Sequence, residues 1–171
     1  MQPTPLRALG ARSLLAVALL TPPLAHADLY MALGIDNESE PSLTLEFDRE
    51  IGLDHWHPGL SLRLAGGVLL LPGRDGDDNA ALLFTPSLRY TFIGSAWQPF
   101  IEAGIGAAVF LDTHYEGRDL ASAFQFEDRL AAGMHLGAGE LMVSYTHYSN
   151  ADIEMPNQGL DIVALGYRVP L

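Results

Sequence analysis

Cysteine is absent from the 171-residue sequence. This absence excludes a catalytic thiol, a disulfide framework and any metal site with cysteine ligands. Lysine is absent too, and nine arginines face 21 acidic residues, which gives a formal net charge of −12. A chain this acidic is poorly suited to bind a phosphate backbone, so we exclude nucleic acid as a partner.

A long apolar run is also missing. The N-terminal run Ser13–Leu20 is too short for a transmembrane helix, which needs about 20 residues. Two arginines precede this run and an Ala-His-Ala motif follows it at residues 25–27, which is the pattern of a secretory signal peptide. We therefore expect a signal peptide over residues 1–27 and one domain over residues 28–171, and we disfavour a helical anchor. Because no second apolar block follows, insertion into a membrane has to use strands.

The rest of the chain alternates apolar and polar residues with a period of two, which is typical of β-strands. Eight such segments follow the leader, each about the length that a tilted membrane strand needs. An even number of strands closes into a barrel without free edges. The sequence therefore predicts an all-β fold, an eight-stranded antiparallel transmembrane β-barrel. The expected strands lie near residues 29–36, 43–48, 60–64, 82–90, 101–109, 121–136, 140–149 and 160–171.

The polar face of these segments carries four acidic residues and four arginines. We expect this face to point inward, because side chains fill the interior of a narrow barrel and charges of both signs can pair there. The alternative is a soluble ligand-binding barrel with an apolar interior, which a charged interior disfavours. The eight charged residues are Glu46, Asp48, Arg63, Arg89, Glu102, Glu127, Arg129 and Arg168.

Asp128 does not fit this alternation, because it has the parity of Phe124 and Phe126. A β-bulge that shifts the parity is our explanation at this level. The connections fit better, since longer, acidic loops alternate with turns that are mostly shorter. This is the pattern of an outer-membrane barrel with both termini in the periplasm. The loops expected outside lie near residues 36–42, 71–80, 112–121 and 150–159.

Three polar residues share the apolar outer face of the last two segments. His147 and Ser149 are two residues apart, and Asp161 has the parity of the apolar positions in its own segment. Strand direction places all three at the external rim, facing lipid of the outer leaflet. A serine next to a histidine whose ring is oriented by a carboxylate is an arrangement for nucleophilic catalysis.

The loop between these segments offers groups that could stabilise an oxyanion, namely backbone amides and the side chains of Asn150 and Asn157. The alternative is that His147 belongs to an interfacial aromatic belt and that Ser149 and Asn150 begin a turn. Spacing alone does not decide between the two.

The residues from Pro99 onward resemble the lipid A 3-O-deacylase (PagL-like) family. The resemblance rests on the segments Pro99–Gly106, Phe126–Arg129, His147–Ala151, Pro156–Asp161 and Tyr167–Leu171. It implies an eight-stranded outer-membrane barrel that hydrolyses the ester-linked 3-hydroxyacyl chain at the 3-position of lipid A. The implied partners are lipopolysaccharide and the surrounding outer-membrane lipids, with no cofactor and no metal. A homodimer is kept as an alternative to a monomer.

The resemblance also assigns roles, with Ser149 as the nucleophile, His147 as the base and Asp161 as the acidic member. Asn157 and main-chain amides after Ser149 match the oxyanion-hole region, which makes Asn150, Asp152 and Asn157 the supporting residues. Two positions depart from the family. The acidic position can be Glu, so Asp161 is one methylene shorter, and Asp152 stands where Gly can occur. Two other functions stay open: a non-catalytic barrel that serves in adhesion or membrane integrity, and an esterase or phospholipase that acts on another lipid.

Overall fold

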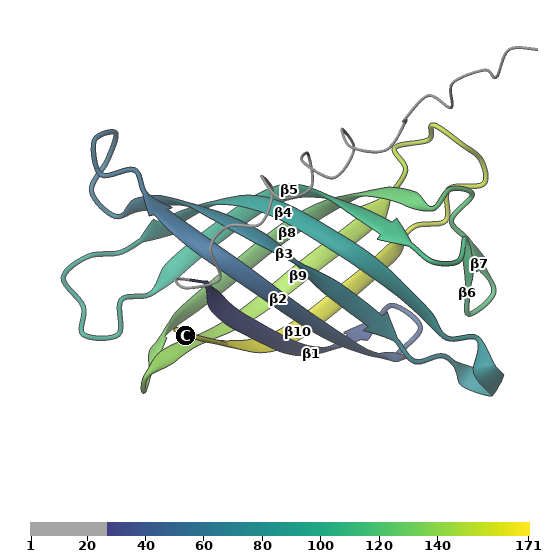
Figure 1. Cartoon of the computed structure of the whole chain (residues 1–171), viewed down its shortest axis with the longest axis horizontal. Helices are drawn as coiled ribbons and strands as arrows, with labels where there is room; N and C mark the ends of the chain where they lie inside the picture. The colour runs from purple at the N-terminus through teal and green to yellow at the C-terminus, as the bar shows by residue number, and fades with distance from the viewer. Residues whose placement is uncertain (1–26) are drawn as a thin grey trace, which may run out of the picture.

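The computed structural model describes residues 27–171, so the signal-peptide prediction falls outside the described residues. Eight long strands form a closed barrel in which every neighbouring pair is antiparallel (Figure 1). This confirms the predicted all-β, eight-stranded fold. The order around the barrel is β1-β10-β9-β8-β5-β4-β3-β2. The strands are β1 (Asp28–Asp36), β2 (Pro41–Gly52), β3 (Leu60–Leu71), β4 (Asn79–Thr91), β5 (Phe100–Phe110), β8 (Phe124–Leu136), β9 (Gly139–Ser149) and β10 (Leu160–Val169).

The segment between β5 and β8 differs from the prediction. A strand was expected from residue 121, but β8 begins at Phe124, and a small hairpin of β6 (His114–Tyr115) and β7 (Arg118–Asp119) precedes it. A short 3-10 helix (Arg74–Gly76) lies between β3 and β4. Among residues 27–171, no helix is long and apolar enough to cross a membrane.

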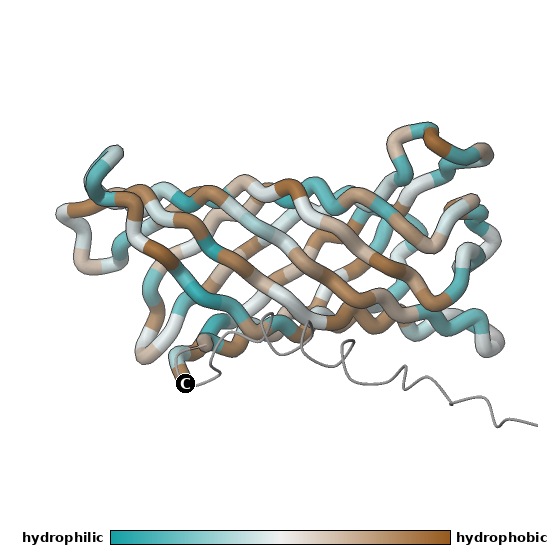
Figure 2. Tube along the Cα trace, turned by 45° about the horizontal axis from the view of Figure 1, so that its top comes forward, coloured by the Kyte–Doolittle hydropathy of each residue, from teal (hydrophilic) through white to brown (hydrophobic). Residues whose placement is uncertain are grey.

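Alternation along each strand divides the barrel into an apolar outside and a polar inside. Apolar positions recur along the strands of the barrel wall (Figure 2), and outward leucines such as Leu33 and Leu130 are 70% and 61% exposed. All eight charged residues that were predicted to point inward are buried. The polarity is therefore the reverse of that in a soluble barrel, as the sequence predicts.

The buried charges form one connected network of ion pairs. Arg63 lies at its centre, with guanidinium nitrogens 2.9 Å from carboxylate oxygens of Glu46 and Asp48 and 3.1 Å from Glu102. Arg129 also pairs with Glu46, at 2.5 Å. Taking charges out of water is costly, and only close partners with good geometry offset that cost. The network therefore stabilises the barrel as a unit, because loss of one member removes an ion-pair partner from several buried charges at once.

Arg89 and Arg168 extend the network toward the end of the barrel at which the C-terminus lies (Figure 1). Both approach the carboxylate of Glu140, at 2.7 and 3.3 Å. Glu140 is buried on the inner face but was missing from the set predicted from the sequence.

The bulge expected near Asp128 is wrong. Strand β8 pairs in unbroken register with β5 from Phe124 to Gly133, and with β9 from Phe126 to Leu136. Asp128 therefore keeps the parity of the phenylalanines, and its side chain is exposed on the outer face. A carboxylate on an otherwise apolar surface is unusual, so its position indicates a candidate functional site on this part of the barrel.

Replacing the central arginine of the network should destabilise the barrel. The Arg63→Met variant would leave Glu46, Asp48 and Glu102 without their shared partner, at an expected cost of about 3–5 kcal/mol. The measurement is the urea concentration at the midpoint of unfolding in detergent. The folded and unfolded fractions are distinguished by their different mobilities on a gel. Arg49→Met is the matched control, since Arg49 lies on neighbouring β2 with an exposed side chain. Equal midpoints for the two variants would contradict a stabilising network.

Candidate active site

Three neighbouring strands place a row of polar side chains on the outer face of the barrel. Asp161 on β10 is directly opposite His147 on β9, and His147 is directly opposite Asp128 on β8. A histidine is therefore flanked by a carboxylate on each side. The sequence predicts His147 and Asp161 as members of this row through their parity. Asp128 is recognisable in the sequence only as a charged residue at a position where the alternation requires an apolar one.

His147 and Asp161 are in direct contact. His147 Nδ1 lies 2.7 Å from Asp161 Oδ1, so the shorter aspartate side chain does reach the ring. When Nδ1 carries the proton it donates to this carboxylate, which leaves Nε2 free to accept a proton. Both side chains are more than one-third exposed, at 38% and 36%, so the pair is open to molecules at the barrel surface.

Ser149 ends β9 and shares the outer face with His147, two residues along the strand. It is half-buried and faces Phe126 of β8 in the register. In the part of the chain that the structure describes, its hydroxyl is not hydrogen-bonded to His147. Catalytic hydrogen bonds are often long in the absence of substrate and become shorter when it binds.

Asp161 Oδ1 also accepts a hydrogen bond from the Tyr145 hydroxyl, at 2.7 Å. The sequence offers one sign of this contact, because Tyr145 precedes His147 by two residues and so shares its face. The diagonal position of Tyr145 relative to Asp161 depends on the register of β9 and β10, which the sequence does not specify.

The loop from Asn150 to Gly159 is held by side chains that were expected near an oxyanion. Asn150 is 1% exposed, and its Nδ2 donates to the carbonyls of Leu120 and Glu154 at 3.1 and 2.9 Å. The Asn150 side chain therefore fixes the loop from inside. Its backbone N–H donates to Asn157 Oδ1 at 3.1 Å, which ties the two ends of the loop together.

Asn157 and Asp152 contact each other. Asn157 Nδ2 donates to Asp152 Oδ1 at 3.1 Å, so the amide that was expected to face an oxyanion has a carboxylate as its partner. Asp152 and Ala151 both adopt left-handed backbone conformations, with φ of 60° and 54°. Such conformations carry a cost for residues with a side chain, and they are typical of constrained functional loops.

Gly159 sits against the open edge of His147. Its φ is 62°, and a Cβ added to it would lie 3.3 Å from Cε1 of the His147 ring and 3.0 Å from the Tyr148 carbonyl oxygen. Glycine is thus required here by backbone conformation and by space. The close approach fixes how the loop passes the side of the ring that carries Nε2.

The β6–β7 hairpin braces this loop, at the end of the barrel opposite the C-terminus (Figure 1). Arg118 donates to the Gly159 carbonyl at 3.3 Å and also pairs with Glu38 of the β1–β2 turn. Asp119 and Gln158 exchange two hydrogen bonds, one from the Asp119 N–H at 2.6 Å and one from the Gln158 N–H at 3.3 Å. This brace is not predictable from the sequence, since a hairpin of two-residue strands has no periodicity to detect.

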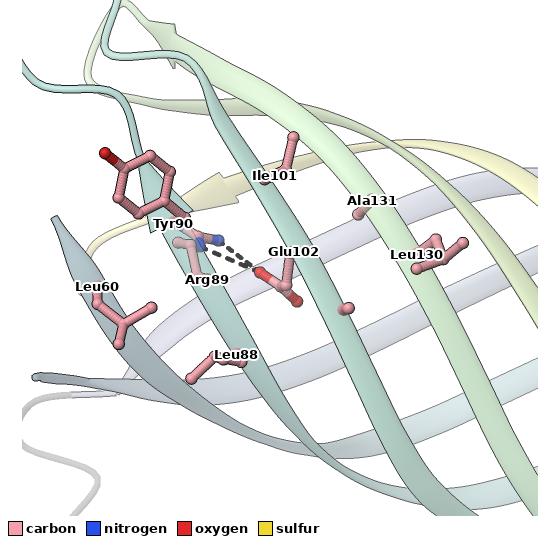
Figure 3. A pocket seen from close by; sticks show the side chains of 9 residues that line it. Leu60, Leu88, Arg89, Tyr90, Ile101, Glu102, Leu130 and Ala131 are labelled. Carbon is pink, nitrogen blue, oxygen red and sulfur yellow. Dashed lines mark hydrogen bonds and ion pairs between the residues drawn. The ribbon is translucent and has the colours of Figure 1, made fainter. Parts of the chain in front are cut away.

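A shallow groove runs along the outer face from this row of polar residues. Its first part has a volume of about 660 Å³ and reaches from Asp128 and Tyr145 past Ile105 and Leu130. A second hollow, of about 420 Å³, adjoins it and continues to Leu60 (Figure 3). Both share Leu88, Ala103 and Leu130, and both are lined mainly by apolar atoms. Over residues 27–171, no group of three or more histidine and acidic side chains is arranged to hold a metal ion.

This chain is similar to known proteins over most of its length. Residues 14–170 match the family described as Lipid A 3-O-deacylase (PagL). A Pseudomonas aeruginosa protein named Lipid A deacylase PagL is 34% identical over 151 residues, which covers 85% of this chain and 87% of that protein. A Bordetella bronchiseptica protein of the same name is 48% identical over 69 residues, 40% of this chain and 39% of that protein.

Among solved structures, the crystal structure of the outer membrane enzyme PagL superposes on this barrel with a TM-score of 0.78. The two chains are 33% identical, and the match covers 85% of this chain and 100% of the other. The likeness therefore extends through the whole barrel and includes the strands that carry the polar row.

A side chain at position 159 should displace the His147 ring. We expect Gly159→Ala to shift the imidazole NMR signals of His147 in detergent micelles, because the new Cβ meets the ring at Cε1. Signals are assigned by their loss in His147→Gln. Gly137→Ala is the matched control: φ there is 65°, but the only nearby atom is the Tyr167 hydroxyl at 3.6 Å. Backbone strain of about 1–2 kcal/mol is common to both variants, so equal His147 spectra would contradict the proposed packing.

Proposed function

This chain belongs to the lipid A 3-O-deacylase (PagL) family, and from that membership we propose that Ser149, His147 and Asp161 carry out its reaction. It is an outer-membrane barrel enzyme with lipid A 3-O-deacylase activity. The observation that supports the three residues is the 2.7 Å contact between His147 and Asp161 on the lipid-facing surface, with Ser149 two residues away on the same face.

In the proposed reaction Ser149 Oγ attacks the carbonyl carbon of the ester at the 3-position of lipid A. His147 Nε2 takes the serine proton, and Asp161 holds the ring and stabilises the imidazolium. The tetrahedral intermediate collapses as His147 returns that proton to the sugar oxygen, which leaves as a hydroxyl. Water, activated by His147, then hydrolyses the acyl-enzyme and releases a 3-hydroxy fatty acid.

The oxyanion would be stabilised by donors from the loop that follows Ser149. We assign this role to Asn157 Nδ2 and to backbone amides after Ser149, with Asn150 as the buried support of the loop. Asn157 Nδ2 has two N–H groups and donates one of them to Asp152 before substrate binds, which leaves the second for the oxyanion. The negative charge of Asp152 beside this amide opposes the negative charge that develops on the oxyanion.

We place the site at outer-leaflet depth. The row of Asp128, His147 and Asp161 lies near the end of the barrel that carries the β6–β7 hairpin, which we take as the external end because the two longest connections, β5–β8 and β9–β10, lie there. The apolar groove that starts at this row gives the substrate's acyl chain a surface along the barrel wall. All three reacting groups come from one chain, so the proposed reaction needs no second copy.

Loss of the serine should abolish deacylation without unfolding the barrel. Mass spectra of lipid A from bacteria that express this chain should show the loss of one 3-hydroxyacyl group. In bacteria that express Ser149→Ala or His147→Ala, lipid A should retain this group. In purified form we expect both variants to be slower by about 10³-fold or more. Gel mobility of the folded barrel controls for structure. Unchanged lipid A with folded wild-type protein would contradict the proposed reaction. Release of fatty acids from phospholipids instead would favour the alternative function, a phospholipase.

Removing the charge of Asp152 should accelerate the reaction. Asp152→Asn keeps a residue that tolerates positive φ and removes the anion that holds the Asn157 amide. We expect kcat to rise roughly threefold to tenfold, since about 1 kcal/mol of transition-state stabilisation corresponds to a factor of this size. Glu154→Gln is the matched control, because Glu154 is an exposed acid of the same loop. A slower Asp152→Asn enzyme, or an equal gain in both variants, would count against this role.

A further inference from the structure

We propose that Tyr145 is a positioning residue for Asp161, and that its hydroxyl keeps the shorter aspartate in reach of His147. The inference rests on the proposed function and adds a fourth residue to its machinery. Tyr145 does not touch the reacting atoms. It acts on the carboxylate, which in turn orients the base.

The geometry places two donors on one oxygen. Asp161 Oδ1 accepts from the Tyr145 hydroxyl at 2.7 Å and lies 2.7 Å from His147 Nδ1. In the register, His147 is opposite Asp161 and Tyr145 is opposite Val163, so Tyr145 reaches Asp161 along the diagonal. Diagonal neighbours on one face of a sheet are within reach of long aromatic side chains. The tyrosine and the histidine thus approach the carboxylate from the same strand, on either side of the oxygen that they share.

The surroundings make this second donor necessary. Apart from Asp128, which is a second carboxylate, the outward side chains beside the pair are apolar, since Val143, Val163 and Leu165 are 53%, 50% and 54% exposed on the lipid-facing wall. A carboxylate in such surroundings is costly unless it accepts hydrogen bonds. The phenol supplies a charge-assisted bond that needs no water. It thereby holds the carboxylate ionised and in a single rotamer.

The length of the acidic side chain gives the tyrosine a specific purpose. Aspartate has one methylene less than glutamate, so fewer of its rotamers bring an oxygen to Nδ1 of the histidine. A hydroxyl that fixes Oδ1 selects the rotamer in which the contact exists. Tyr145 therefore provides the orientation that a longer carboxylate side chain would obtain from its reach.

Tyr145 also lines the apolar groove, beside Asp128 and Leu130, and is 45% exposed there. Its ring forms part of the surface along which we place the acyl chain, while its hydroxyl holds the acid. A substrate that packs against the ring would restrict the tyrosine further, so occupancy of the groove and alignment of the acid are linked through one side chain.

The test is Tyr145→Phe in the full-length purified protein, assayed on lipid A in detergent. The ring and its packing in the groove are kept, so KM should stay within about twofold, whereas kcat should fall about tenfold or more because the hydrogen bond to a charged group is lost. Tyr167→Phe is the matched control. The Tyr167 hydroxyl donates to the Leu136 carbonyl at 2.6 Å, far from the polar row, so its removal should leave kcat unchanged.

A double-mutant cycle separates positioning from a general structural effect. In an Asp161→Asn background, Tyr145→Phe should change kcat by less than about twofold, since there is no carboxylate left to orient. The imidazole NMR signals of His147 supply a readout without substrate, and they should change in Tyr145→Phe and not in Tyr167→Phe. A Tyr145→Phe enzyme with wild-type kcat, or with the same loss in both backgrounds, would overturn the role of Tyr145.

Failure of the underlying function would look different. If wild-type protein and Ser149→Ala released acyl chains equally, the catalytic assignment would fall and the role of Tyr145 with it. If Ser149-dependent hydrolysis were intact and Tyr145→Phe had no effect, only the inference on Tyr145 would fail.

Discussion

The buried ion-pair network is the constraint from which the rest of this structure follows. Arg63, Glu46 and their partners line the interior of the barrel with buried charges, so the interior is poorly suited to an apolar acyl chain. Alternation along each strand then places apolar side chains outside, and any reacting group has to lie either in a loop or on the lipid-facing wall. The site that we propose uses both, with the histidine and the acid on strands and the proposed oxyanion donors on a loop.

Polar groups on such a wall are stable only when they satisfy one another. His147, Asp161 and Tyr145 do so through two short contacts to a single oxygen, which also leaves the outer edge of the histidine free to accept a proton. The strands fix these three side chains by register, whereas the loop needs additional support. That support comes from the buried Asn150 and from the β6–β7 hairpin, whose Arg118 and Asp119 hold the residues just before β10.

Much of this arrangement is predictable from the sequence, because a period of two specifies which face each strand residue occupies. Parity alone groups His147, Ser149 and Asp161, and it separates the charges that prove to be buried. Parity also predicts that the Asp128 side chain points outward. The bulge that we expected there from the sequence would have turned it inward, and this expectation was wrong. Contacts that depend on strand register or on loop shape cannot be predicted from the alternation of apolar and polar residues. The diagonal bond of Tyr145, the pairing of Asn157 with Asp152 and the β6–β7 hairpin all belong to this class.

A lipid-facing site has an energetic logic for a substrate with long acyl chains. Moving such a chain out of hydrocarbon into water costs about 0.8 kcal/mol for each CH₂ group, so an internal or aqueous site would have to offset a large extraction penalty before any chemistry. On the outer wall the chain stays in an apolar environment, and the groove beside Tyr145 and Leu130 exchanges lipid contacts for protein contacts. Binding energy is then available for orientation of the ester. In the proposed reaction the polar row supplies the remaining requirement, because the proposed base and its carboxylate partner lie on strands and are in contact before the substrate diffuses to them in the plane of the membrane.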